Sequence, residues 1–410
     1  MINRTVLKQI EISVKTKPVT LITGARQVGK TTLATLFIEK GFSYVSLDSP
    51  REREMAREDP ELFLSLHPWP LIIDEIQKAP GLFDAMESVV NKEKINNPHN
   101  YGMYIITGSQ AYRLMQGVTE SMAGRISIIH MLPLSRSEIL GQEEPPFNFD
   151  LASIQNRATA SPLPPLSLYE EIVRGHFPEL YDNENINQDT FYEDYIESYI
   201  ERDVSEIINV RDKLAFRRYM EVLASLTGQE LIYNNIAKAI EMDVKTIQAW
   251  TSVLLAGDII HLLEPYNDTS VIKRVVKRPK VYFSDTGLAC HLLKVNSAAT
   301  LASSFFSGGF VETYVVNEIR SSYLNNRKNV GLYYYRDNNG NEIDLLVLKD
   351  GSLHRIEIKS GIAYDSKAIK AFKQVEGTSY NLGTSLLICS TDKVYPIVKG
   401  QVYAIPIAGI

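Results

Sequence analysis

Residues 24–31 have the sequence GARQVGKT, which fits the phosphate-binding pattern G-x-x-x-x-G-K-[ST]. Gly24 and Gly29 let the backbone curl so that its N–H groups point at phosphate oxygens. The start of the helix that follows attracts an anion. Lys30 is expected to reach the β- and γ-phosphates of ATP, and the Thr31 hydroxyl to ligate Mg²⁺. A glycine-rich turn with an exposed lysine is the alternative interpretation. Further nucleotide contacts are predicted for Arg26, Gln27, Val28 and Thr32.

An acidic pair follows the apolar run LIIDE at residues 71–75. In open α/β sheets the ligand binds at the carboxyl ends of the strands, and this pair lies at such an end. Asp74 is predicted to hold the Mg²⁺ shell, and Glu75 to polarise the attacking water. The alternative is a pair of helix-capping residues after a strand.

Four further polar positions are candidates for the same site. Ser109 and Thr107, in YIITGS, end another apolar run and can orient water between Glu75 and the γ-phosphate. Gln77 is a second candidate for placing that water. Arg125, in ESMAGRI, could contact the γ-phosphate within its own chain or from a neighbouring subunit, as arginine fingers do. The alternatives are a plain turn for the first two and a surface arginine for the last.

A second constellation lies near the C-terminus, where Asp344 precedes the E-x-K pair of Glu357 and Lys359. Residues i and i+2 of a strand face the same side, so these three side chains are expected to converge. Two carboxylates can hold a divalent cation, and a lysine beside them can activate water. Glu312 on the preceding helix could complete the metal shell, with Glu318 as its alternative. The order is that of PD-(D/E)xK nucleases. A surface ion-pair face and a nuclease-like fold without cleavage remain open.

The elements that must position the first constellation form an alternating pattern. Nearly continuous apolar runs, typical of strands covered on both faces, alternate with helical segments and predict a doubly wound α/β domain with a parallel sheet. The predicted strands are residues 19–24, 42–48, 69–75 and 101–108.

The predicted organisation has four parts. Residues 1–141 form a P-loop ATPase domain, and the proline-rich stretch 142–166 a linker without regular elements. Residues 167–283 are expected to be helical and to end in a winged helix, with two helices at 229–257 followed by a strand. Residues 284–410 form a mixed α/β unit with a restriction-endonuclease-like fold.

Composition limits the partners. The 410 residues carry a net charge of −6, and the two cysteines exclude a disulfide framework. No apolar run is long enough to cross a membrane and the N-terminus lacks a signal-peptide core, so a cytoplasmic location is expected. Five basic residues in VIKRVVKRPK at 271–280 could follow the phosphate backbone of DNA or pair with the acidic segment 151–208.

Taken together, GARQVGKTTL, LIIDEIQ, ITGSQ, ESMAGR, LPLSRSE, SYIERDV, KRPKVYFSDTGL, NEIDLLV and IEIKSG resemble a family of AAA-type ATPases of bacteria and archaea with a C-terminal domain of uncharacterised function. The resemblance implies ATP binding and hydrolysis, a winged helix in the middle and a nuclease-like C-terminal fold. It places Ser109 at the sensor position. His176, in RGHFPEL, departs from the family, which usually has a second glycine there.

Two functions follow from these patterns. The first is ATP hydrolysis coupled to nucleic-acid binding or processing, with DNA as the partner and a second divalent metal at the C-terminal site. The second is a nucleotide-dependent switch whose C-terminal unit binds a protein partner without cleaving. An oligomer is compatible with either, since Arg125 could act between subunits.

Overall fold

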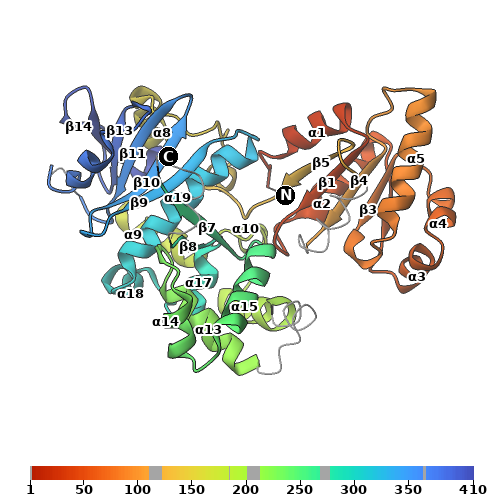
Figure 1. Ribbon diagram of the computed structural model, residues 1–410, viewed down its shortest axis with the longest axis horizontal. Coiled ribbons are helices and arrows are strands. Elements are labelled where there is room, and N and C mark those ends of the chain that lie inside the picture. The colour runs from red at the N-terminus through yellow and green to blue at the C-terminus, as the bar shows by residue number, and fades with distance from the viewer. Residues whose placement is uncertain (1, 110–121, 184, 201–212, 268–277, 363–365) are drawn as a thin grey trace.

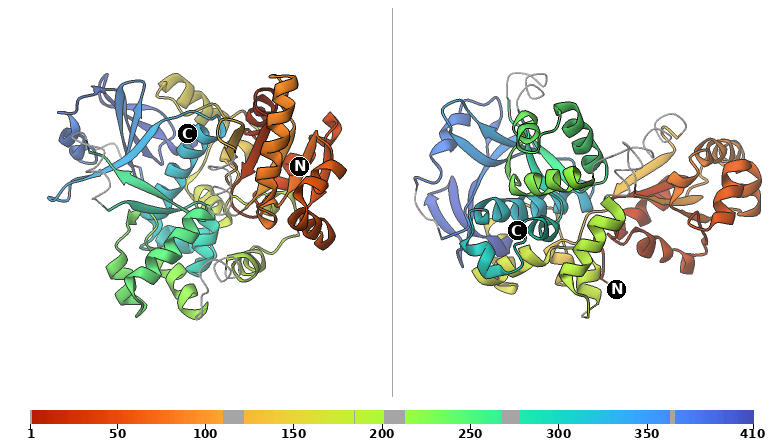
Figure 2. Two further views of the ribbon diagram at one scale, coloured as in Figure 1. Left: turned by 45° about the vertical axis from the view of Figure 1, so that its right-hand side comes forward. Right: turned by 90° about the horizontal axis from the view of Figure 1, so that it is seen from below.

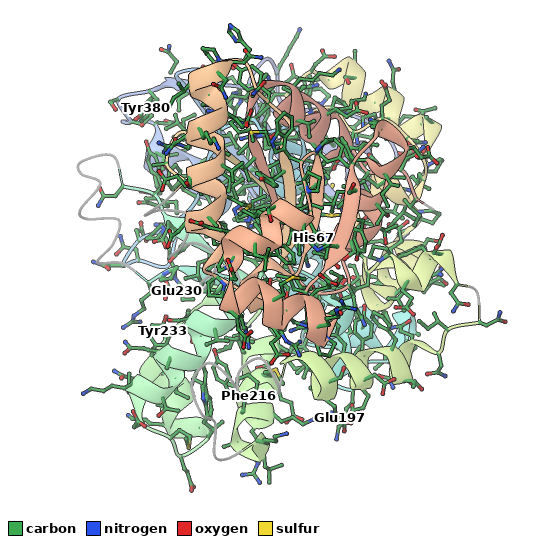
Figure 3. The ribbon with its side chains drawn as sticks, turned by 90° about the vertical axis from the view of Figure 1, so that its right-hand side faces the viewer. His67, Glu197, Phe216, Glu230, Tyr233 and Tyr380 are labelled. Atoms are coloured by element: carbon green, nitrogen blue, oxygen red, sulfur yellow. The ribbon has the colours of Figure 1, made fainter. Side chains whose placement is uncertain are left out.

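The computed structural model describes residues 2–109, 122–183, 185–200, 213–267, 278–362 and 366–410. The N-terminal domain stands at one end of the molecule and the C-terminal strands at the other, with the middle helices below and between them (Figure 1). The two views of Figure 2 keep the same separation. Figure 3 looks from the N-terminal side, with His67 in the domain nearest the viewer and Phe216 and Tyr233 in the helices beneath it.

The N-terminal domain is built on a five-stranded sheet in the order β2-β3-β4-β1-β5, in which every pair of neighbours is parallel. Its central strands are buried along their whole length, as their apolar sequences require. The prediction of a doubly wound α/β domain is thus confirmed. Its elements are α1 (Leu7–Thr16), β1 (Val19–Thr23), α2 (Lys30–Thr35), η1 (Ile38–Lys40), β2 (Ser43–Ser46), α3 (Pro50–Glu58), α4 (Pro60–Leu66), β3 (Leu71–Asp74), η2 (Ile76–Lys78), α5 (Leu82–Asn96), β4 (Tyr104–Gly108) and β5 (Ile126–His130).

The proline-rich stretch 142–166 is not wholly irregular, so the expectation of a linker without regular elements is wrong for part of it. Helix α8 (Leu151–Ala160) begins at Asp150, whose carboxylate accepts the N–H of Ser153 at 2.9 Å. The prolines flank this helix and mark its two ends. Gln155 on α8 accepts the N–H of Val394 at 2.8 Å, so the helix packs on the C-terminal part of the chain.

Short helices connect the N-terminal domain to the rest: α7 (Arg136–Ile139), α9 (Pro165–Arg174) and α10 (Glu179–Asp182). Between α9 and α10, Gly175 has a φ of 73°. The next residue, His176, is buried and its backbone N–H donates to Asp285 at 2.6 Å. Burial lowers the pKa of the His176 imidazole to about 4, so this side chain is neutral in the fold.

The middle region is helical and contains three short antiparallel strands paired in the order β7-β8-β6. Within the acidic segment 151–208, α11 is followed by a π-helical turn, and residues 201–208 lie outside the described part of the chain. The elements are α11 (Gln188–Tyr195), η3 (Ile196–Ile200), α13 (Lys213–Ser225), β6 (Gln229–Glu230), α14 (Tyr233–Ala239), α15 (Val244–Ala256), β7 (Ile260–Pro265) and β8 (Lys280–Phe283).

The C-terminal region is a mixed sheet with the long helix α19 packed on it (Figure 1). Residues 370–375 form a 3₁₀ segment, η4. The elements are α17 (Thr286–Leu292), α18 (Ala298–Ser303), α19 (Ser307–Asn325), β9 (Gly331–Arg336), β10 (Glu342–Lys349), β11 (Ser352–Ile358), η4 (Lys370–Val375), β12 (Asn381–Leu382), β13 (Ser385–Cys389), β14 (Tyr395–Val398), β15 (Val402–Pro406) and η5 (Ile407–Gly409).

One sheet spans the middle and C-terminal regions. Strand β7 pairs in parallel with β9, where Glu264 is opposite Tyr333 and Pro265 opposite Tyr334. The strands therefore run continuously in the order β14-β15-β13-β11-β10-β9-β7-β8-β6. The predicted boundary at 283/284 falls between strand β8 and helix α17 of this shared structure.

Candidate functional site

The loop between β1 and α2 needs glycine at its first position. Gly24 has a φ of 144°, and a Cβ built on it would lie 2.1 Å from the carbonyl oxygen of Met131. Gly29, with a φ of 94°, precedes the first residue of α2. These two conformations turn the chain sharply out of β1 and into the helix, as the predicted phosphate-binding loop requires.

A buried arginine that the sequence analysis missed holds this loop. Arg4 donates from Nη1 to the carbonyl of Val28 at 2.7 Å and from Nη2 to the carbonyl of Leu132 at 2.6 Å. Its Nε lies 3.0 Å from Oε2 of Glu138. Glu138 also caps α7 together with Ser135, and the pattern S-x-x-E in LPLSRSE was the sequence signal for that cap. Nothing local to Arg4 signalled its role.

Lys30 is buried under the loop that it is expected to serve. Its ammonium donates to the carbonyls of Gly24 at 3.0 Å and Ala25 at 2.6 Å. Burial lowers the pKa of Lys30 to about 8, against a smaller raising effect of Glu75. Gln27 has a φ of 61°, and its buried Oε1 has no hydrogen-bond partner among the residues that the structure describes. The loop thus holds a cation and a polar group available to a ligand.

Asp74 collects three hydroxyl groups at the end of β3. Its Oδ1 accepts from Thr31 at 3.0 Å and from Thr107, and its Oδ2 accepts from Tyr44 at 3.1 Å. Burial and the neighbouring Asp74 carboxylate raise the pKa of Tyr44 to about 12. The structure therefore brings Thr31, Asp74 and Thr107 together as predicted, and it adds Tyr44.

Glu75 occupies a backbone conformation that is uncommon outside glycine, with a φ of 59° and a ψ of 44°. Its N–H donates to the hydroxyl of Thr107 at 3.2 Å, and its Oε2 accepts from the amide of Gln77. That same amide lies 3.4 Å from the hydroxyl of Ser109. Glu75, Gln77 and Ser109 thus form one connected group.

A pocket of about 580 Å³ opens above the loop. One wall comes from the N-terminal domain and includes Asp48, Glu75 and Met131. The other wall comes from α10 and the residues beside it, which the sequence analysis did not single out. The predicted residues that line the pocket are Arg26, Gln27, Val28, Gly29, Lys30, Thr31, Thr32 and Glu75; the opposite wall is Pro178, Glu179, Asp182 and Asn183.

The structure does not bring Arg125 to this pocket. Its Nε donates to the side chain of Asn91 at 2.8 Å, and its Nη1 lies 3.3 Å from the carboxylate of Glu87. Both partners belong to α5. A role for Arg125 at the nucleotide of its own chain is therefore not supported, and a role between subunits stays a prediction.

The C-terminal constellation does converge. Lys359 Nζ lies 2.5 Å from Glu357 Oε1 and 4.0 Å from Asp344 Oδ2, on neighbouring strands β10 and β11. Asp344 also accepts the backbone N–H of Ile358 at 2.8 Å. Glu318 lies elsewhere, because both its oxygens accept the N–H of Arg136 at 3.1–3.2 Å. Burial raises the pKa of Glu318 to about 8.

Lys280, which the sequence analysis placed in a basic run that follows nucleic acid, is instead buried within this constellation. Its Nζ lies 2.7 Å from Oε1 of Glu312 and 2.5 Å from Oε1 of Glu342. Burial alone would lower the pKa of Lys280, but the carboxylates of Glu312, Asp344 and Glu342 raise it above its ordinary value. Residues 271–277 of the run lie outside the described part of the chain.

No group of three or more His, Cys, Asp or Glu residues is arranged to hold a metal ion in the part of the chain that the structure describes. The predicted second divalent metal is therefore not shown. In the same described residues no helix is both long and apolar enough to cross a membrane.

Comparison with known proteins agrees with this geometry at the N-terminal end. Residues 16–140 match the family model of an AAA domain. Together with the parallel sheet and the loop after β1, this match supports an AAA-type ATPase domain that binds ATP at the N-terminal end of the chain. Residues 166–299 and 307–410 match two domains of unknown function, DUF8612 and DUF4143.

The chain is also similar to two uncharacterised mycobacterial proteins. Rv2008c of Mycobacterium tuberculosis and Mb2031c of Mycobacterium bovis are each 27% identical to it over 345 residues, which are 83% of this chain and 70% of the relative. Among solved structures, the Walker-type ATPase PABY2304 of Pyrococcus abyssi aligns with a TM-score of 0.43 and 13% identity, covering 70% of this chain and 94% of that one. A Thermotoga maritima RuvB variant aligns at 0.31 and 14%, covering 63% and 89%.

Proposed function

We propose that this chain binds ATP with Mg²⁺ and hydrolyses it, and that the bound nucleotide sets how the AAA domain sits against the rest of the chain. The observation that carries this proposal is the pocket with two walls. A nucleotide on the phosphate-binding loop would also meet Pro178, Glu179 and Asn183 of the opposite wall. A ligand that contacts both bodies can shift their arrangement only by binding one arrangement more tightly.

The chemistry assigned to the site uses residues that already lie together. Backbone N–H groups of the loop and the Lys30 ammonium hold the phosphates. Thr31 and Asp74 would hold Mg²⁺, which supplies positive charge to the phosphate oxygens. Glu75 accepts the proton of the attacking water, Gln77 orients its carboxylate, and the hydroxyl of Ser109 accepts from the same Gln77 amide. The left-handed backbone of Glu75 is the kind of strain that clusters at functional sites.

A chain of buried contacts connects the loop with the C-terminal region. Arg4 joins the Val28 carbonyl to Glu138 at one side of α7. On the other side, the first N–H of α7, that of Arg136, binds Glu318 of α19. A displacement of the loop on nucleotide binding would therefore act on α19 through one buried ion pair, Arg4–Glu138, and one hydrogen bond, from the Arg136 N–H to Glu318. These contacts support coupling between the ends of the molecule.

The test is hydrogen exchange of the full-length chain with a non-hydrolysable ATP analogue and Mg²⁺. Amides of residues 179–183 should exchange more slowly with the analogue than without it, whereas those of α18, Ala298–Ser303, should not change. ATP turnover is measured in parallel. Turnover without any change at 179–183 would leave an ATPase but refute the switch. Absence of nucleotide binding would refute both.

Nucleic-acid binding is a second candidate, favoured by the middle region. The order α13, β6, α14, α15, β7, β8 is that of a winged helix, and α15 exposes Lys245, Gln248 and Ser252. Binding should weaken steeply between 50 and 200 mM salt. Lys245→Glu should reduce it, whereas Lys92→Glu on α5 should not. If the C-terminal unit cleaves DNA, Lys359→Ala should abolish this metal-dependent cleavage. The two lysines among the C-terminal carboxylates, Lys280 and Lys359, favour a unit that does not cleave DNA.

A further inference from the structure

Four carboxylates from three elements meet near the middle of the continuous sheet: Glu312 of α19, Glu342 and Asp344 of β10, and Glu357 of β11, called here the carboxylate cluster. Two lysines, Lys280 and Lys359, contact it. Lys359 lies at its outer side with its side chain 43% exposed, whereas the side chain of Lys280 is 1% exposed.

The contacts of Lys280 are those of an enclosed cation. Its ammonium lies 2.7 Å from Glu312, 2.5 Å from Glu342 and 4.0 Å from Asp344. The ring of Tyr334 stands 5.5 Å away, and this aromatic face also favours a positive charge. A long side chain is rarely buried to this extent unless its charge is paired, so its place in the cluster is specific.

A divalent cation does not fit among the same oxygens. Such an ion needs several free oxygen ligands at once. Oε1 of Glu312 accepts from Lys280 and, at 2.6 Å, from the hydroxyl of Tyr282, while the two oxygens of Glu342 face Lys280 and Arg336. Asp344 accepts a backbone N–H and faces both lysines. Of these carboxylates, Glu357 alone is recorded with a buried oxygen, Oε2, that lacks a partner in the described structure.

We propose that Lys280 is the resident cation of the carboxylate cluster, so that this chain uses a nuclease-type motif as a metal-free ion-pair joint. The joint fixes β8, at the end of the middle region, to α19 and β10 of the C-terminal region. This inference does not depend on ATP hydrolysis. In this view the D…E-x-K motif has a structural role, and the Lys280 ammonium occupies the position that a metal ion would take.

Loss of the Lys280 charge should have an effect that loss of a lysine from a surface ion pair would not have. Removing the Lys280 ammonium leaves Glu312, Glu342 and Asp344 facing one another in a buried space, where their mutual repulsion is unrelieved. A divalent cation can then replace the missing charge. Lys280→Met, which keeps the stem and removes the charge, should therefore create a metal site that the natural chain lacks.

The experiment is calorimetric titration of Mn²⁺ into the nucleotide-free, full-length chain. Lys280→Met should gain one Mn²⁺ site at least tenfold tighter than any in the natural chain, and adding Asp344→Asn should remove it. Lys280→Arg and Lys238→Met, the latter an exposed lysine of α14, should bind Mn²⁺ as the natural chain does. Mn²⁺ should also raise the thermal midpoint of Lys280→Met more than that of the natural chain.

Two variants decide the matter even if Lys280→Met does not fold. In chains that retain Lys280, Asp344→Asn and Glu357→Gln should leave Mn²⁺ binding unchanged. The proposal is overturned if the natural chain binds Mn²⁺ and either variant abolishes that binding. Such a result would show that a metal binds at the carboxylate cluster while Lys280 is present.

Discussion

Arg4 and Glu138 form a buried ion pair across 134 residues of sequence, with Arg4 Nε 3.0 Å from Glu138 Oε2. The guanidinium is also the donor to Val28 in the phosphate-binding loop, and the carboxylate also caps α7. One contact thus holds both the nucleotide loop and the first helix that leaves the AAA domain.

Arg4→Met should destabilise the chain and weaken nucleotide binding together. Breaking one partner of a buried pair costs about 3–5 kcal/mol, because the other charge is left uncompensated. We expect ATP affinity to fall at least tenfold, since the Val28 carbonyl loses its donor. Denaturant unfolding and binding of a fluorescent ATP analogue measure the two effects. Arg51→Met, on the exposed side of α3, is the matched control. The double variant Arg4→Met/Glu138→Gln tests the pairing, because the effects of residues in contact are coupled. If the two losses in the free energy of unfolding simply add in the double variant, the ion pair is contradicted.

Lys30→Ala and Glu75→Gln should separate binding from hydrolysis. The first removes the cation of the phosphate loop and should abolish measurable ATP binding. The second keeps the shape of the side chain but removes the base, so binding should persist while turnover falls by about 10²–10⁴-fold. Steady-state turnover and equilibrium binding distinguish the two. Unchanged turnover in Glu75→Gln would assign the base to another residue.

Gly24→Ala should cost far more than a glycine substitution elsewhere. Its Cβ would stand 2.1 Å from the backbone oxygen of Met131, which has no flexible end that can move away. Gly41 also has a positive φ, of 91°, but nothing lies within 4 Å of its Cβ. Gly41→Ala should therefore cost only about 1–2 kcal/mol for the backbone conformation, and Gly24→Ala several times more, with loss of ATP binding. Similar denaturation midpoints for the two would show that the loop adapts.

The stability of the chain should decrease as the pH rises from 4.5 to 8, in part because of Glu318. Burial raises the pKa of Glu318 from 4.5 to about 8, with Glu144 adding to the effect and Arg136 opposing it. Glu171 and Arg157 also face this carboxyl group. The folded state therefore retains a proton that the unfolded state releases in this window, so the stabilisation is complete below pH 4.5 and is lost through pH 8.

Glu318→Gln removes this titration, because an amide stays neutral throughout. Between pH 5 and 8 the free energy of unfolding of the variant should fall less than that of the natural chain. At pH 8 the two losses should differ by on the order of 2–4 kcal/mol. Denaturant unfolding at several pH values measures the slope. Glu170→Gln, an exposed position of α9, should keep the natural slope. A parallel slope in Glu318→Gln would show that Glu318 is ionised in the fold.

The nucleotide site could be predicted from sequence because its residues are set by local rules. Lys30 and Thr31 follow the loop at fixed spacing, and Asp74 and Glu75 follow a strand whose carboxyl end must face the ligand. Arg4 could not be found in this way, because its partners Val28 and Glu138 are brought to it only by the fold. The opposite wall of the pocket is equally non-local.

The errors in the fold have a common physical origin. The prolines at 145, 146, 162, 164 and 165 were interpreted as a broken stretch, but they border α8, whose start is fixed by Asp150. Lys280 was grouped with its basic sequence neighbours as a contact to DNA or to the acidic segment 151–208, yet carboxylates from three other positions enclose it. A run of charged residues predicts exposure to solvent only where the fold does not supply partners that replace the water around those charges.

The pairing of β7 with β9 bears on how this chain can be inherited and recombined. Its two halves fall in regions that match different families, residues 166–299 and 307–410. A gene break between them would leave each fragment with an unpaired strand edge, a template for association with other chains. A rearrangement that moved one region without the other would expose this edge, so we expect the two regions to be inherited together.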